Sequence, residues 1–146
     1  MKKKDLPPKF QELVETAIQA RERAYVPYSH FRVGAALLSM DDEIWSGCNI
    51  ENAAFSPTNC GERTAIFKAV SEGHKDFRAI AVAGWKEGQE AGFAYPCGVC
   101  RQVMLEFCDP DYFEVLVTDG DEVTIHTLAS LIPHGFGGLH DQGVIF

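Results

Sequence analysis

The chain has 146 residues, a formal net charge of −8 and a composition that is 46% hydrophobic and 23% charged. This length suits one domain with its own core, so the sequence predicts a single domain over residues 1–146. The acidic charge disfavours nucleic-acid binding, because a phosphate backbone would be repelled. No apolar run approaches the roughly 20 residues that a membrane helix needs, and the basic start at Met1–Lys4 lacks the pattern of a signal peptide. We therefore expect a cytoplasmic protein that makes no membrane contact.

The first third of the chain predicts a helix followed by a hairpin. Apolar residues recur at three- and four-residue spacing between Lys9 and Ala24, which predicts one amphipathic helix. Phe31–Ser39 is apolar on both alternations, which is typical of a strand buried on both faces. Asp41–Asp42 supplies a turn, and Glu43–Cys48 is expected to return as the second strand.

The middle of the chain predicts a helix, a strand and a second helix. Residues 49–59 are rich in Asn, Ser and Pro and indicate a loop. Thr64–Val70 is apolar almost all round, so it predicts a central helix that begins near Cys60. Arg78–Trp85 contains a short continuous apolar run that favours an interior strand, and Pro96–Cys108 predicts the next helix.

The last third predicts two more strands, Tyr112–Thr118 and Glu122–Thr127. The Asp119–Gly120 turn between them favours antiparallel pairing. Leu128–Ile132 predicts a short helical turn. This order of elements indicates an α/β fold of three layers, in which a mixed five-stranded sheet has helices on both faces.

Three of the five cysteines stand near the predicted starts of two helices. Cys60 is followed two positions later by Glu62, and Cys97 and Cys100 come three apart directly after a proline. Three thiolates are one ligand too few for a closed zinc site, but they suit a catalytic zinc that keeps one position for water. Glu62 is then the candidate proton carrier beside that water. The helix starts favour this chemistry, because a helix N-terminus stabilises thiolates.

Two other interpretations of these cysteines stay open. A Cys-x-x-Cys pair also occurs in redox motifs and as half of a structural zinc site. A structural zinc would need a fourth ligand, for which His74 and Cys48 are candidates, although neither lies at a typical spacing. The odd number of cysteines argues against a disulfide framework, and Cys48 and Cys108 are interpreted as small buried hydrophobic residues.

Two arginines stand next to the cysteines. Three thiolates would leave a zinc site negatively charged, which weakens the metal as a Lewis acid. Arg63 and Arg101 are candidates to offset this charge by hydrogen bonding to sulfur. For Glu62, the plain alternative is a helix glutamate that faces solvent.

The segment Cys60-Gly61-Glu62, followed by Pro96-Cys97-Gly98-Val99-Cys100, resembles the signature of the zinc deaminases. With cysteine in first place, and with matching segments at 28–36, 47–53 and 100–102, nearly the whole chain resembles the small homotetrameric cytidine deaminases. The resemblance implies the cytidine deaminase-like fold. It also implies hydrolytic deamination of cytidine and 2′-deoxycytidine to uridine and 2′-deoxyuridine plus ammonia, as in pyrimidine salvage.

The same resemblance implies a catalytic centre. Cys60, Cys97 and Cys100 would hold one Zn²⁺ per subunit, and a zinc-bound hydroxide would attack C4 of the base. Glu62 would shuttle protons to the pyrimidine N3 and to the leaving amine. Gln102, like Arg63, would contact the metal ligands without binding the zinc itself.

The resemblance further implies a substrate-binding set. Asn49 and Glu51 would hydrogen-bond the ribose 3′-hydroxyl, and the Gly61 N–H would contact the base carbonyl. Phe31 would pack against the substrate. Phe136 would stack on the base from a neighbouring subunit, so that a homotetramer would share its active sites.

Two positions depart from the family's pattern. Gly61 stands where an alanine is usual, which keeps the N–H but loosens the helix start. Phe55 stands where the family often has a tyrosine that reaches the neighbouring active site, so we expect a raised KM with catalysis intact. Alternative functions are a deaminase of another aminopyrimidine nucleoside, such as blasticidin S, and a non-enzymatic interaction module that zinc stabilises. The sugar-binding pair Asn49 and Glu51 favours the nucleoside.

Overall fold

A mixed sheet of five strands forms the middle of the protein, and the computed structural model describes residues 1–137. The strands are β1 (Phe31–Ser39), β2 (Ile44–Cys48), β3 (Phe77–Lys86), β4 (Glu114–Thr118) and β5 (Val123–Thr127). They lie in the order β2-β1-β3-β4-β5, with β3 and β4 parallel and the other neighbours antiparallel. Both predicted hairpins are therefore confirmed.

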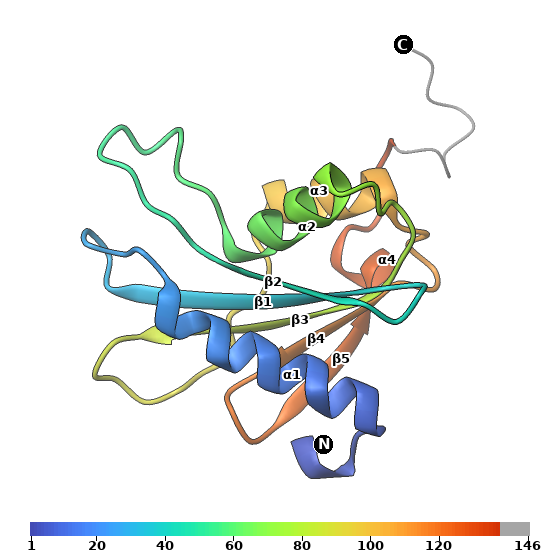
Figure 1. Ribbon diagram of the computed structural model, residues 1–146, viewed down its shortest axis with the longest axis horizontal. Coiled ribbons are helices and arrows are strands. Elements are labelled where there is room, and N and C mark those ends of the chain that lie inside the picture. The colour runs from blue at the N-terminus through green and yellow to red at the C-terminus, as the bar shows by residue number, and fades with distance from the viewer. Residues whose placement is uncertain (138–146) are drawn as a thin grey trace.

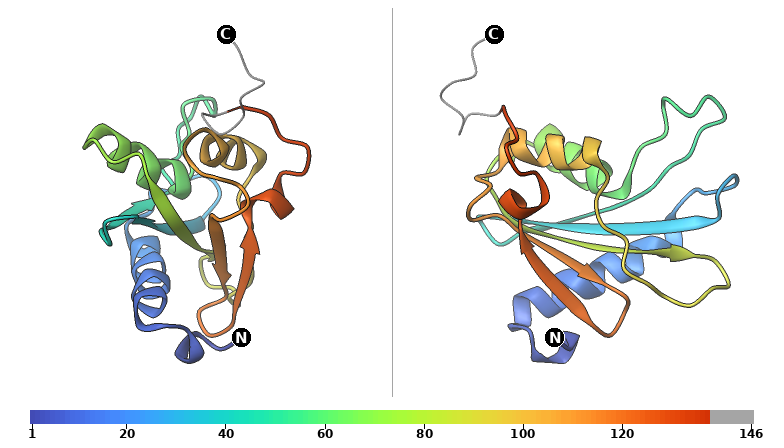
Figure 2. Two further views of the ribbon diagram at one scale, coloured as in Figure 1. Left: turned by 90° about the vertical axis from the view of Figure 1, so that its right-hand side faces the viewer. Right: turned by 180° about the vertical axis from the view of Figure 1, so that it is seen from behind.

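Helices cover both faces of this sheet (Figures 1 and 2). The helix α1 (Pro8–Ala20) lies on one face, and α2 (Gly61–Ser71), α3 (Gly98–Phe107) and the short α4 (Leu128–Leu131) lie on the other. The three-layer α/β fold predicted from the sequence is confirmed. Among the described residues, no helix has the length and apolar composition that a membrane crossing requires.

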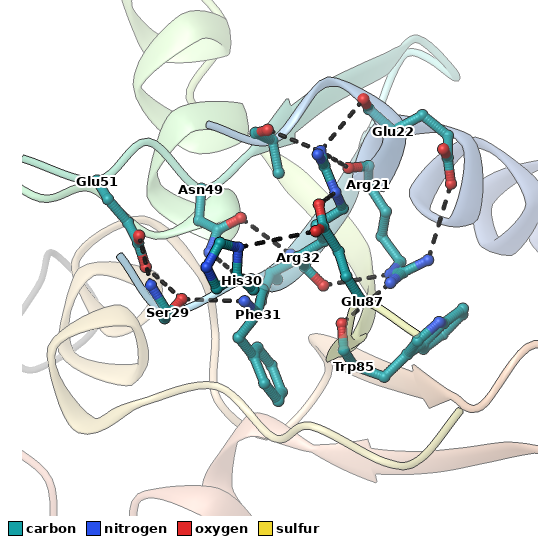
Figure 3. A network of polar contacts seen from close by, with 12 residues as sticks. Arg21, Glu22, Ser29, His30, Phe31, Arg32, Asn49, Glu51, Trp85 and Glu87 are labelled. Atoms are coloured by element: carbon teal, nitrogen blue, oxygen red, sulfur yellow. Dashed lines mark hydrogen bonds and ion pairs between the residues drawn. The ribbon is translucent and has the colours of Figure 1, made fainter. Parts of the chain in front are cut away.

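The first helix ends earlier than its apolar pattern predicts. Regular α-helix stops at Ala20 instead of Ala24, and a 3₁₀ turn (Arg21–Arg23) follows it. The Arg21 side chain turns inward there, with its guanidinium carbon 3.6 Å from the ring centroid of Trp85. It also donates to the carbonyl oxygens of Arg32 and Trp85, as Figure 3 shows. Polar contacts of a buried arginine accompany the change in helix geometry, and apolar periodicity does not report them.

Alternate residues of β1 belong to two separate cores. Ala35 and Leu37 pack with residues of α2 and α3, whereas Ala36 and Leu38 pack with residues of α1. All four side chains are fully buried. The strand is apolar on both alternations because each of its faces meets a helical layer.

A glycine in β2 sets how closely α2 approaches the sheet. A Cβ at Gly47 would stand 2.5 Å from the backbone N of Ala65 and 2.6 Å from the carbonyl O of Gly61, so no larger residue fits without movement. The N-terminal half of α2 therefore lies directly on β2. This contact fixes the position of the helix start, where Cys60 is the N-cap residue.

Candidate metal centre and pocket

Three thiols converge where α2 and α3 begin. The Sγ atoms of Cys60 and Cys97 are 3.7 Å apart, and those of Cys97 and Cys100 are 3.6 Å apart. A tetrahedral zinc with Zn–S bonds of about 2.3 Å holds its sulfurs about 3.8 Å apart, so this spacing fits one zinc ion. Neither His74 nor Cys48 belongs to the cluster. The donor set is therefore three sulfurs, which is the set expected of a site that keeps a position for water.

Helix starts place these sulfurs. Cys60 and Cys97 are the N-cap residues of α2 and α3, both in extended conformation, and Cys100 lies in the first turn of α3. The first N–H groups of a helix have no intrahelical acceptor and carry a partial positive charge. Two such starts that meet at one point favour thiolates there.

Hydrogen bonds make the thiol of Cys60 more acidic and the thiol of Cys100 less acidic. The bond with Cys100, together with bonds from Arg63 and Cys97, lowers the pKa of Cys60 to about 5. The same bond with Cys60 raises the pKa of Cys100 above its usual value. Arg63 Nη2 donates to Cys60 Sγ at 3.1 Å, which is the contact that its place in the sequence suggested.

Arg101 has a different role from the one expected. Its Nε donates to the carbonyl O of Pro96 and its Nη1 to the carbonyl O of Leu131, each at 2.7 Å. The guanidinium therefore joins the start of α3 to the end of α4. Of the two arginines considered from the sequence, Arg63 is the one that bonds to a sulfur.

Glu62 is buried beside the sulfurs. Its exposed fraction is 4%, and it lines the same pocket as Cys60 and Cys97. Burial raises the pKa of Glu62 to about 7. A carboxyl group with this pKa can both accept and donate a proton near neutral pH. The alternative of a helix glutamate that faces solvent does not hold.

A pocket of about 280 Å³ opens beside the sulfurs and Glu62. Five of its lining residues were singled out from the sequence: Phe31, Asn49, Cys60, Glu62 and Cys97. Sequence reasoning missed six others, which are Val33, Thr58, Asn59, Val82, Ala94 and Tyr95. Thr58, Asn59 and Tyr95 could have been found, because each stands within two residues of a cysteine ligand candidate. The two valines could not, because their strands resemble any buried strand.

Gly61 lies at the first position of α2 and packs against β1. A Cβ there would lie 3.3 Å from Val33 Cγ1 and from the carbonyl O of Val33. An alanine at this position would therefore require a shift of a few tenths of an ångström in β1. The glycine that departs from the family's pattern matches the close approach of α2 to β1 in this chain.

Asn49 and Glu51 both bond to the segment around the start of β1 (Figure 3). Asn49 Oδ1 accepts from Val33 N at 2.9 Å, and its Nδ2 donates to the carbonyl O of Phe31 at 2.8 Å. The Glu51 carboxylate accepts from the backbone N–H groups of Tyr28 and Ser29. Partial burial opposes ionisation, but these bonds and the Ser29 hydroxyl hold the pKa of Glu51 below its usual value. Asn49 lines the pocket, whereas Glu51 is not among the lining residues and bonds to Ser29, two positions before Phe31 of the lining.

Phe55, Phe136 and Gln102 lie outside the pocket lining. Phe55 is 76% exposed, with a φ of 60°, in the long loop between β2 and α2 that extends away from the body in Figure 1. Phe136 is 63% exposed, and Gln102 Nε2 donates to its carbonyl O at 2.9 Å. Gln102 therefore bonds to the backbone at Phe136 and to none of the three sulfurs.

Three convergent thiols, a buried carboxyl group of raised pKa and an adjoining pocket define a zinc-dependent enzyme of the hydrolytic class. A family model described as the cytidine and deoxycytidylate deaminase zinc-binding region matches residues 8–114, and the chain belongs to this family.

Individual relatives agree with this assignment. A cytidine deaminase of Sporosarcina psychrophila is 51% identical over 129 residues, which cover 86% of this chain and 90% of the relative. The crystal structure of cytidine deaminase from Burkholderia pseudomallei superposes with a TM-score of 0.78 at 45% identity, over 86% of this chain and 98% of that one. A blasticidin-S deaminase of Bacillus cereus is 35% identical, over 84% of this chain and 88% of the relative.

Proposed function

We propose that this protein deaminates cytidine and 2′-deoxycytidine hydrolytically to uridine and 2′-deoxyuridine, with release of ammonia. The observation that carries the proposal is the set of three sulfurs and a buried carboxyl group beside a pocket that has Asn49 and Phe31 among its lining residues. The metal end matches hydrolytic chemistry, and the other end offers polar and aromatic groups of the kind that bind a nucleoside.

Cys60, Cys97 and Cys100 would hold one Zn²⁺ per chain, since their Sγ spacing fits a tetrahedral ion. Zinc bound there supplies Lewis-acid activation of water, which makes a nucleophile available near neutral pH. Arg63 offsets part of the negative charge of the three sulfurs through its bond to Cys60 Sγ. This lessens the loss of Lewis acidity that three thiolates would cause.

Glu62 moves the protons of the reaction. Its carboxylate takes a proton from water and delivers it to N3 of the cytosine ring, while the water oxygen bonds to C4. It then takes the proton of the new C4 hydroxyl group and delivers it to N4, so that the C4–N4 bond breaks, ammonia leaves and C4 becomes a carbonyl. A pKa of about 7 suits both directions, because neither protonation state is strongly disfavoured. Burial of the group keeps bulk water from competing for these protons.

The remaining residues hold the substrate. The Gly61 N–H at the start of α2 donates to the base carbonyl, and Phe31 packs against the substrate. Asn49 and Glu51 bind the ribose 3′-hydroxyl. Both side chains are already fixed by bonds to the β1 region, so little side-chain entropy is lost when the sugar binds.

The single-domain chain acts as a cytoplasmic homotetramer with shared active sites. Support comes from Phe55 and Phe136, which are strongly exposed outside their own pocket and would enter that of a neighbour. Phe67 on α2 and Val99 on α3 are also exposed apolar side chains, and an assembly would cover them.

A spectrophotometric assay with cytidine, combined with zinc quantitation on the purified protein, tests the proposal. We expect turnover of cytidine and about one zinc per chain. A protein with neither activity nor zinc would overturn it. Faster turnover of blasticidin S than of cytidine would favour the alternative substrate, and zinc without any deaminase activity would favour an interaction module.

A further inference from the structure

Residues 28–31, at the start of β1, bond to Asn49 and Glu51, the two polar residues proposed to bind the sugar. The segment ends with Phe31, the aromatic residue that lines the pocket. Residues 28–31 bond to Glu51 on one side and to Glu87 on the other (Figure 3). His30 within it has a φ of 58°, a left-handed conformation that is uncommon for a residue with a side chain. Such a backbone persists when the surrounding contacts hold it.

The Ser29 hydroxyl lies at the centre of these contacts. Its Oγ accepts from the backbone N of Phe31 at 3.0 Å and lies 2.5 Å from Glu51 Oε2. The N–H of Phe31 can only donate, and an ionised carboxylate can only accept. The single proton of the hydroxyl must therefore be directed to Glu51. The bonds run in one direction, from Phe31 through Ser29 to the carboxylate.

These contacts use most of the hydrogen-bonding capacity of Glu51. Its Oε1 accepts from Tyr28 N and Ser29 N, each at 3.1 Å, and its Oε2 accepts from the Ser29 hydroxyl. A carboxylate offers about four lone-pair sites, so the contacts of the described residues leave about one, on Oε2. Ser29 bonds to this same oxygen and thus sets where the remaining site is directed.

The backbone of Phe31 is held from both sides by the same group of residues. Its N–H donates to Ser29, and its carbonyl O accepts from Asn49 Nδ2 at 2.8 Å. Phe31 and Asn49 line the pocket. The Asn49 bond does not involve Ser29, so Phe31 keeps this support when the Ser29 hydroxyl is removed.

The opposite side of the segment has its own support. Glu87 N donates to the carbonyl O of His30 at 2.8 Å, and the Glu87 carboxylate pairs with Arg32. Arg32 also donates to the carbonyl O of Ala24 at 2.8 Å. These bonds do not involve Ser29, so the segment stays folded when the Ser29 hydroxyl is removed.

We propose that Ser29 is a positioning residue for the substrate sugar: its hydroxyl orients the Glu51 carboxylate so that the remaining lone pair of Oε2 accepts the ribose 3′-hydroxyl. The inference rests on the proposed function, because it requires a nucleoside in the pocket. It makes recognition of the 3′-hydroxyl a joint property of Ser29 and Glu51.

Steady-state kinetics with cytidine and 3′-deoxycytidine test this, using wild type, Ser29→Ala, Ser29→Thr and Ser71→Ala. The Ser71 hydroxyl also donates one hydrogen bond, to the carbonyl O of Lys68, but at the end of α2 and outside the pocket lining. We expect Ser29→Ala to raise KM for cytidine about tenfold with kcat within about twofold of wild type, the scale of one lost bond to a charged group. For 3′-deoxycytidine, Ser29→Ala and wild type should have the same kcat/KM. Ser29→Thr should keep the wild-type KM, as should Ser71→Ala.

Three results would overturn the inference. Equal losses on both substrates would mean that Ser29 acts on the pocket in general. Unchanged cytidine kinetics would mean that the hydroxyl does not position Glu51, and a Ser29→Thr variant as impaired as Ser29→Ala would assign the effect to packing. In each case wild-type turnover of cytidine leaves the proposed function standing. Absence of that turnover overturns the proposed function and the inference together.

Discussion

The zinc end of the pocket and the end proposed to bind the sugar, called the sugar end below, are built from different parts of the fold. At the zinc end, helix starts carry the functional groups, and Cys100 and Glu62 are buried. At the sugar end, Asn49 and Glu51 lie outside regular structure and depend on bonds to the segment around the start of β1. Rigid, buried positions suit groups whose pKa and distance must be exact for chemistry, and bonded loop positions suit recognition. Substitutions at the zinc end should therefore lower kcat, and substitutions at the sugar end should raise KM.

The largest effect is expected from removal of a zinc ligand. Cys100→Ala should reduce zinc content from about one per chain towards zero and bring turnover below detection, because two sulfurs do not form a zinc site. Metal analysis and the cytidine assay measure both. Cys108→Ala is the matched control. Cys108 is also buried and caps the C-terminal end of α3, but it does not belong to the sulfur cluster. It should cost about 1 kcal/mol of stability and keep zinc and turnover. A Cys100→Ala protein that retains full zinc would contradict the ligand assignment.

An intermediate effect is expected from the residue that bonds to a ligand. Arg63→Ala removes the 3.1 Å bond to Cys60 Sγ, so kcat should fall about tenfold while zinc remains bound. Arg78→Ala is a control on the opposite face of the sheet, where the guanidinium lies over Phe10. Zinc quantitation beside kcat separates a loss of metal from a loss of activation. Unchanged turnover in Arg63→Ala would mean that the bond from Arg63 to Cys60 Sγ does not contribute to activation at the zinc centre.

The smallest effect is expected at the exposed loop between β2 and α2. Phe55→Tyr restores a hydroxyl that could reach the sugar in a neighbouring subunit, and KM for cytidine should fall about twofold to threefold with kcat unchanged. The comparison is by steady-state kinetics, with gel filtration to check that the assembly is the same. A KM equal to that of wild type would argue that position 55 makes no contact with substrate.

Short-range patterns in the sequence were enough for the strands and, apart from the end of α1, for the helices. The meeting of Cys60 with Cys97, 37 positions away, was expected from metal-ligand chemistry and from the family resemblance. The spacing of Cys97 and Cys100 and the proximity of Cys60 to Glu62 are local, and local spacing on a helix start dictates which side chains can meet. The sequence left open whether Glu62 faces solvent, and the structure decides this, because the residue is buried with an exposed fraction of 4%.

Contacts between distant segments could not be predicted in this way. Arg101 stands beside a ligand in the sequence, yet its guanidinium bonds to Pro96 and Leu131. The bond of Ser29 to Glu51 joins residues 22 positions apart, and no periodicity signals it. The early end of α1 has the same origin, because it coincides with the contact between Arg21 and Trp85.

The central claim is that Glu62 carries the protons of a deamination at a three-cysteine zinc centre. The most direct measurement is kcat for cytidine in wild type and Glu62→Gln, with zinc content determined on the same samples. We predict that both proteins bind about one zinc and that kcat of Glu62→Gln falls by about a thousandfold, as expected for loss of a general acid and base. A Glu62→Gln protein with wild-type kcat would contradict the account.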